Sequence, residues 1–187
     1  MGTDIHAIGQ IKKDGKWTTT AIDIAGCDRS YNVFAVLANV RNGSGFAGTD
    51  TGEEWEVLYP PRGLPKDVDI HMEYGEITII DEYFIGDHGH SYLSLQELKS
   101  IWDHFKDREY EIHGMVKKEE LSKLKQGILP QIWCYDTHDP NYVNAKWKVP
   151  CKEALWYLGE FIDVLDNLRS ENELNDEEIR MVFGFDS

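Results

Sequence analysis

The chain has 187 residues, with 34 acidic and 19 basic side chains, a formal net charge of −15, and a hydrophobic content of 41%. It is long enough to bury the core of one globular domain, and we predict a single domain over residues 1–187. The charge argues against a long nucleic acid as partner, because a grip on the phosphate backbone requires many Lys or Arg contacts. No apolar run approaches the roughly 20 residues of a membrane span. We therefore expect an intracellular protein with no membrane partner.

The first predicted elements are two strands and a helix. Residues 4–11 (DIHAIGQI) and 16–22 (KWTTTAI) flank Asp14-Gly15, which is a strong signal for a two-residue hairpin turn. Residues 30–40 (SYNVFAVLANV) then place apolar side chains at helical spacing. The sequence thus predicts an N-terminal hairpin followed by a helix.

Residues 41–66 form the first long irregular segment. Gly, Pro, Asn and Asp dominate it, and loops of this length in compact domains are usually functional or disordered. We expect an ordered loop, because its aromatic side chains would be costly to leave in water. We also expect it to pack near residues 87–92.

The second half of the chain mixes strands and helices without a β-α-β rhythm. Ser94 and Glu97 form a capping box before a helical apolar stripe, and the last segment alternates apolar residues, which predicts a strand with one buried face. The fold class is therefore α+β, a mainly antiparallel sheet packed against three or four helices. Strands are predicted over 75–85, 110–116 and 178–186, helices over 94–105, 117–127 and 151–170, and a second long irregular segment over 131–150.

Residues 43–48 (GSGFAG) match the pattern G-x-G-x-x-G. The dinucleotide-binding form of this motif needs a strand before it and a helix after it, whereas here a helix precedes it and an acidic segment follows, so we exclude a Rossmann motif. Glycine backbone N–H groups can still approach an anion closely, and the alternative is a mobile loop. The candidate ligand-binding residues of this segment are Arg41, Asn42, Gly43, Gly45 and Phe46.

Arg62 lies between Pro61 and Gly63 in the stretch PPRGLP. The proline restricts the backbone, and we expect the Arg62 side chain to be free to reach a ligand. Its guanidinium would suit a bidentate contact with a phosphate or carboxylate. The alternative is a surface arginine on a turn.

Three Asp-x-His or His-x-His arrangements add polar candidates. Asp4 and His6 share one face of a predicted strand. His88 and His90 precede the capped helix, together with Ser91 and Tyr92. These histidines suit metal ligation, acid–base chemistry or anion binding near the helix N-terminus. The spacing matches no established metal signature, so we predict no metal and no other cofactor. A third pair, Asp136 with His138, adds no further signature, and the three cysteines contain no C-x-x-C.

The stretches MGTDIH, VRNG, PPRGLP, DHGHSYL and VFGFD together resemble an uncharacterised family of small bacteriophage and prophage proteins. The likeness spans most of the chain, although members of the family often have Cys where this chain has Thr3. The resemblance implies a single domain and a phage origin, and hence the cytoplasm of the bacterial host cell as location. It implies no activity.

A phage origin suggests a function by analogy, since several unrelated small phage proteins disarm bacterial immunity by capturing or cleaving nucleotide signals. The leading hypothesis is a protein that sequesters a small phosphate-bearing nucleotide, such as a cyclic dinucleotide or an ADP-ribose derivative. Arginines would hold the phosphates and loop aromatics would stack on a base. One alternative is a phosphodiesterase that uses His88 and His90. Another is a protein inhibitor that covers a host enzyme's active site, and the sequence leaves a homodimer open.

Overall fold

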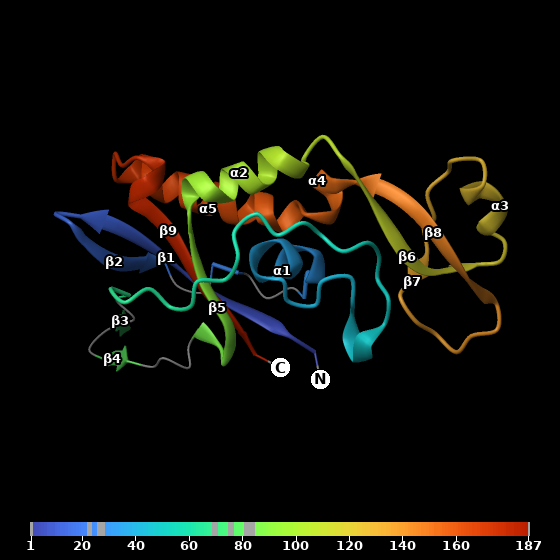
Figure 1. Ribbon diagram of the computed structural model, residues 1–187, viewed down its shortest axis with the longest axis horizontal. Helices are drawn as coiled ribbons and strands as arrows, with labels where there is room; N and C mark the ends of the chain where they lie inside the picture. Colours follow the sequence, from blue (N-terminus) through green and yellow to red (C-terminus); the bar gives the residue numbers. More distant parts are fainter. Residues whose placement is uncertain are drawn as a thin grey trace.

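The computed structural model describes residues 2–21, 24–25, 29–68, 71–74, 77–80 and 85–186, with the backbone alone described for 71–74 and 77–80. Over these residues the fold is α+β, as predicted, with antiparallel sheets of four and three strands, a separate antiparallel pair of strands, and helices packed against the two larger sheets. The two larger sheets lie at opposite ends of the molecule, and the helices α2 (Leu95–Phe105), α4 (Cys151–Ala154) and α5 (Trp156–Glu171) run along the side that joins them (Figure 1). Buried side chains from both sheets belong to one continuous apolar core.

The larger sheet has the order β2 (Lys16–Ala21), β1 (Asp4–Lys13), β9 (Ile179–Asp186) and β5 (His88–Ser94). The predicted hairpin at Asp14-Gly15 and the C-terminal strand are both confirmed. The two chain ends lie together, because Asp4 pairs with Asp186 in the register of β1 and β9 (Figure 1).

The prediction that the last strand is half-buried is wrong, because every residue from Ile179 to Phe185 is buried. One face of β9 packs against the helices through Phe183 and Phe185. The other face carries Val182, which packs with Ile85 and with side chains of the segment 64–68. Because both faces of β9 are covered, its successive side chains alternate between two buried layers and not between the core and solvent.

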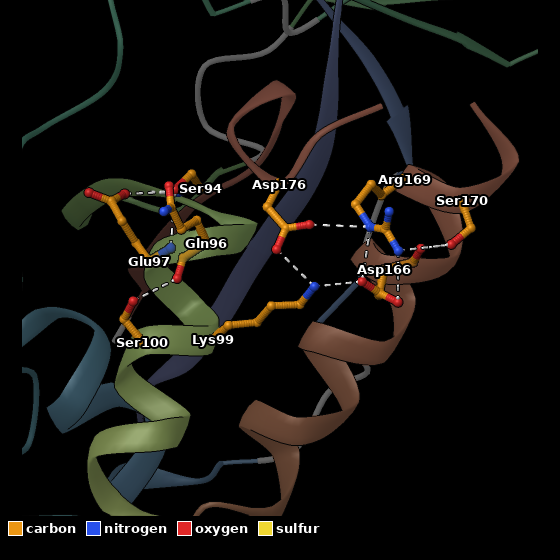
Figure 2. Close-up of polar contacts among 9 residues, drawn as sticks. All are labelled: Ser94, Gln96, Glu97, Lys99, Ser100, Asp166, Arg169, Ser170 and Asp176. Atoms are coloured by element: carbon orange, nitrogen blue, oxygen red, sulfur yellow. Dashed lines mark hydrogen bonds and ion pairs between the residues drawn. The ribbon is translucent and has the colours of Figure 1, made fainter. Parts of the chain in front are cut away.

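The helical layer of this sheet consists of α1 (Tyr31–Ala38), α2 (Leu95–Phe105) and α5 (Trp156–Glu171). The predicted capping box is confirmed: Ser94 Oγ accepts a hydrogen bond from the Glu97 backbone N–H at 3.2 Å, and a Glu97 carboxylate oxygen accepts one from the Ser94 N–H at 2.9 Å (Figure 2).

An ion network joins the two long helices. The Lys99 ammonium on α2 donates to Asp166 on α5 at 2.7 Å and to Asp176 at 2.9 Å, and Asp176 begins η3 (Asp176–Glu178) just before β9 (Figure 2). Arg169 contacts the same two carboxylates at 3.1 and 3.2 Å. The network therefore ties α2, α5 and the start of β9 together.

The smaller sheet has the order β7 (Trp133–Cys134), β6 (Glu109–Lys117) and β8 (Tyr142–Pro150). Residues 131–150 were predicted to be irregular; this is confirmed for 135–141 but wrong for 142–150, because β8 pairs with β6 along its whole length. The alternation of exposed Lys146 and Lys148 with buried Trp147 and Val149 was the available strand signal.

Two predicted helices differ in extent. The helix predicted over 151–170 is two helices, α4 (Cys151–Ala154) and α5, because Leu155 leaves helical geometry at φ −111° and ψ 21°. The helix predicted over 117–127 is only α3 (Leu121–Leu124). The strand predicted over 75–85 contains β4 (Ile77–Ile80), which pairs with β3 (His71–Tyr74), and its residues 75–76 and 81–84 lie outside the described residues.

The segment 41–66 is ordered and crosses from one sheet to the other. At its start is η1 (Phe46–Gly48), and Gly52 then pairs with Ile112 of β6. Near its end, the Gly63 N–H donates to the His90 carbonyl at 3.0 Å, so the predicted packing near residues 87–92 is confirmed. Within the described ranges, no helix has the length and apolar character to cross a membrane.

Candidate functional site

A cleft of about 640 Å³ lies at the junction of the two halves of the fold. It lies against the start of α1, the core face of β6 and β8, and the break between α4 and α5. We call it the aromatic cleft, because its lining includes the side chains of Tyr31, Trp133, Tyr135, Trp147, Trp156 and Tyr157.

Strand pairing and the helix break explain this gathering of rings. Trp133 of β7 and Trp147 of β8 reach the same face of the sheet from either side of β6, with ring centroids 5.1 Å apart and edge-on. Tyr135 packs against Trp133 in the same way at 4.9 Å. Trp156 and Tyr157 follow Leu155, where the helix breaks, and Trp156 remains 48% exposed. Such half-open rings are suited to stacking on a planar group.

Arg29 is the cationic side chain that lines the aromatic cleft. Its Nε and Nη2 donate to the two carboxylate oxygens of Asp4 at 2.7 and 3.2 Å. This hydrogen-bonded pair raises the pKa of Arg29 and lowers that of the Asp4 carboxyl. A guanidinium has five N–H donors, so the pair with Asp4 leaves Nη1 able to donate to an anionic ligand.

The cleft also has one uncommitted carboxylate. Glu153 of α4 lines the cleft and is exposed, and in the part of the chain that the structure describes it makes no ion pair or side-chain hydrogen bond. The other polar lining groups are Ser30, Asn32 and Thr51. Asn32 is engaged, because its side-chain oxygen accepts from the Trp55 indole N–H at 3.2 Å.

The predicted Asp4 and His6 lie at the edge of this region, on β1. Asp4 reaches it through Arg29, whereas His6 donates to Asp186 at 2.9 Å, away from the cleft lining. Arg41 lies behind the cleft: its Nε donates to the buried Thr3 hydroxyl at 3.0 Å, and its guanidinium stands 6.0 Å from the Tyr31 ring. Arg41 therefore supports a ring of the cleft wall.

The glycine segment does not present an open row of N–H groups. The Ser44 N–H donates to the Arg41 carbonyl at 2.9 Å, the Gly45 N–H to Thr49 at 2.7 Å, and the Gly48 N–H back to Gly45 at 3.3 Å. Gly43 accepts from the Thr51 N–H at 3.1 Å, and the neighbouring Phe46 is 58% exposed outside the cleft. The segment is a tight turn whose polar backbone is largely used internally.

Asn42 clamps this segment to Trp55. Its side-chain oxygen accepts from the Trp55 backbone N–H at 2.7 Å, and its Nδ2 donates to the Trp55 carbonyl at 2.9 Å. Trp55 in turn stacks on Tyr110 at 4.2 Å and is 6% exposed. The side-chain amide of Asn42 therefore pairs with the Trp55 backbone through one donor and one acceptor, as a neighbouring strand residue would.

The expectation that the Arg62 side chain is free is wrong. Its guanidinium makes a bidentate pair with Glu97, with N–O distances of 2.5 and 3.2 Å, and lies 5.3 Å from the Tyr92 ring. Its backbone N–H donates to the Ser91 hydroxyl at 3.2 Å. Burial alone would raise the pKa of Glu97, but the hydrogen bonds from Arg62 and Ser94 lower it. Arg62 and Tyr92 line a separate, smaller cavity of about 310 Å³.

The two histidines of β5 are committed to neighbours and do not converge. His88 donates to Asp87 at 2.6 Å, and His90 Nε2 donates to the Gly86 carbonyl at 2.9 Å. A register shift between His88 and Ser91 breaks the simple alternation of faces, and the His90 ring lies over Gly184, where any side chain would collide with it. Across the described ranges, no group of three or more His, Cys, Asp or Glu could hold a metal ion.

Sequence reasoning missed Arg29 and His113. The position of the Arg29 side chain depends on its pair with Asp4, which is 25 residues away and leaves no local signal in the sequence. His113 of β6 has Nδ1 2.8 Å from Asp50 and Nε2 2.9 Å from Glu111, so its protonated ring donates to both carboxylates, and the hydrogen bond with Asp50 is the main cause that raises the pKa of His113. The Glu-x-His spacing of Glu111 and His113 on a strand was a local signal for the second contact only.

Comparison of the chain with protein-family models, with curated proteins and with solved structures yields no match.

Proposed function

We propose that the protein binds a small nucleotide in the aromatic cleft and sequesters it. The observation that carries the proposal is the combination of six aromatic side chains with Arg29 in one cleft of about 640 Å³. This volume falls within the range of small-molecule sites, roughly 300–1,000 Å³, which are lined mainly by apolar and aromatic groups with a few polar ones.

The chemistry of the lining favours a planar ring that bears an anionic group. Exposed Trp156 offers a face for a base, and each base stacked on an aromatic side chain contributes about 1–3 kcal/mol. The free donors of Arg29 suit a phosphate oxygen, and a charge-assisted hydrogen bond contributes about 1.5–3 kcal/mol net. Capture at nanomolar concentration needs roughly −12 kcal/mol, which several such contacts can supply.

Binding is favoured over catalysis by the composition of the cleft. Its lining contains no His or Cys among the described residues, and the histidines His88 and His90, which would serve a phosphodiesterase, are bonded to Asp87 and Gly86 instead. The proposal follows the phage resemblance in its biological setting: capture of a nucleotide immune signal in the cytoplasm of an infected bacterium.

The test is a fluorescence titration, because Trp133, Trp147 and Trp156 all line the cleft. The purified protein is titrated with AMP, GMP, ADP-ribose and a cyclic dinucleotide, and retained ligand is released by denaturation and identified by mass spectrometry. We expect at least one probe to quench the fluorescence and to be released intact. If the released ligand were cleaved, the phosphodiesterase hypothesis would replace capture. If no probe quenched the fluorescence and none was retained by the protein, the proposal would be refuted.

Two variants locate the site. Trp156→Ala removes a half-exposed ring of the cleft that also packs on Tyr157 at 3.6 Å, and it should weaken binding roughly 5- to 150-fold while lowering the melting temperature by only about 2–4 °C. Phe46→Ala is the control, since Phe46 is also an exposed aromatic side chain, at 58% against 48% for Trp156, but lies outside the cleft lining. Equal loss of binding in both variants would place the ligand elsewhere.

A further inference from the structure

The geometry points to guanine as the base that the aromatic cleft selects, with Glu153 as the residue that reads it. This inference rests on the proposed function and adds a specificity to it. Its starting point is Glu153, an exposed carboxylate without a protein partner in the described part of the chain, in a cleft whose lining also includes six aromatic side chains.

Arg29, the other charged side chain in the lining of the cleft, already has a carboxylate partner. Arg29 neutralises Asp4 across two hydrogen bonds. Arg41 is held against Thr3 and Tyr31. Glu153 is thus the carboxylate of the lining whose oxygens can accept hydrogen bonds from a bound molecule. A ring stacked beside it would remove part of its water, and a carboxylate that loses water without gaining hydrogen bonds costs free energy. A ligand that fits must bring hydrogen-bond donors to it.

Nucleobases differ in what they bring. An ionised carboxylate is an acceptor with two oxygens, so it pairs best with two adjacent donors. Guanine presents its N1–H and its N2 amino group side by side. Adenine presents one amino donor next to the N1 acceptor, whose lone pair would face a carboxylate oxygen. Uracil offers one N–H between two carbonyls. Guanine is therefore the common base whose edge matches Glu153.

The magnitude of the preference follows from edge recognition in general. A good bidentate contact discriminates against the wrong base by about 1–3 kcal/mol, which corresponds to roughly 5- to 150-fold in affinity. Glu153 is exposed, so water competes for its oxygens, and we expect the lower part of this range, about 10-fold in favour of GMP over AMP.

The experiment is a fluorescence titration of the wild-type protein and of Glu153→Gln with GMP, IMP, AMP and XMP. IMP lacks the 2-amino group, and XMP carries a carbonyl in its place. In the wild type we expect GMP to bind about 10-fold more tightly than AMP, with IMP between them. A glutamine amide offers one acceptor and one donor, which matches N1–H and the C2 carbonyl of xanthine, so Glu153→Gln should lose the GMP preference and gain affinity for XMP.

The outcomes separate the two proposals. Equal binding of GMP and AMP by the wild type would overturn the guanine inference and leave nucleotide capture standing. A Glu153→Gln variant that binds GMP as the wild type does would also overturn it. No binding of any nucleotide, with quenching by tetramethylammonium, would overturn both, because aromatic rings beside a carboxylate also suit an organic cation. Glu153→Gln is checked for folding by its thermal melt, and Lys152→Gln, at the exposed neighbouring position, is the matched control.

Discussion

Replacing Asn42 with Ala tests whether this residue holds the loop or binds the ligand. In the structure Asn42 makes two hydrogen bonds with the backbone of Trp55 and one with Asn39 at 2.9 Å. Each hydrogen bond contributes about 0.5–1.5 kcal/mol net, and Asn42 is half-buried, so water can replace part of what is lost. We expect Asn42→Ala to lower the free energy of unfolding by about 2 kcal/mol. That corresponds to a fall in melting temperature of roughly 4–8 °C for a domain of this size.

The measurement is urea denaturation followed by far-ultraviolet circular dichroism, together with a nucleotide titration of the folded variant. Asn144→Ala is the matched control, because Asn144 of β8 is exposed and makes no side-chain hydrogen bond in the described part of the chain. Its unfolding free energy should change by no more than about 0.5 kcal/mol. A wild-type urea midpoint for Asn42→Ala would refute the clamp. If stability were kept but nucleotide binding lost, Asn42 would contact the ligand, as the sequence first predicted.

Three further substitutions test the supports of the site. Gly52→Ala should destabilise the protein by about 1–3 kcal/mol in a thermal melt, because φ is +150° and a Cβ would lie 2.4 Å from a carbonyl oxygen of β6; a neutral effect would contradict this pairing. His113 has a raised folded-state pKa, so its pair with Asp50 stabilises fully below about pH 6.5 and less as pH rises through the folded pKa. Asp50→Asn should therefore cost under about 1 kcal/mol in urea melts at pH 5.5 and less at pH 9, and a cost that grows with pH would refute the assignment. Arg62→Ala should lower unfolding stability by about 1 kcal/mol through loss of the Glu97 pair, with nucleotide affinity unchanged; weaker nucleotide binding would return Arg62 to the site.

The sequence by itself determined those elements whose signals lie within a few residues. Asp14-Gly15 specifies a hairpin turn because both positions adopt positive φ, at 50° and 78°. Ser94 and Glu97 specify the start of α2 through hydrogen bonds that span one helical turn. The order of the loop at 41–66 also followed from the sequence, because aromatic side chains such as Trp55 must be buried somewhere.

Only the tertiary structure decided which distant groups meet. Arg29 pairs with Asp4 and Arg62 with Glu97, contacts that span 25 and 35 residues and depend on the strand order. A charged side chain beside a flexible turn looks free in a sequence, and the fold supplies the carboxylate that neutralises it. The aromatic cleft likewise needs β7, β8 and the break at Leu155 to be placed together, so its rings appear in the sequence only as scattered Trp and Tyr. Local hydrogen-bonding patterns are encoded by neighbouring residues, whereas a cavity is a property of how the packed layers fail to fill space between them.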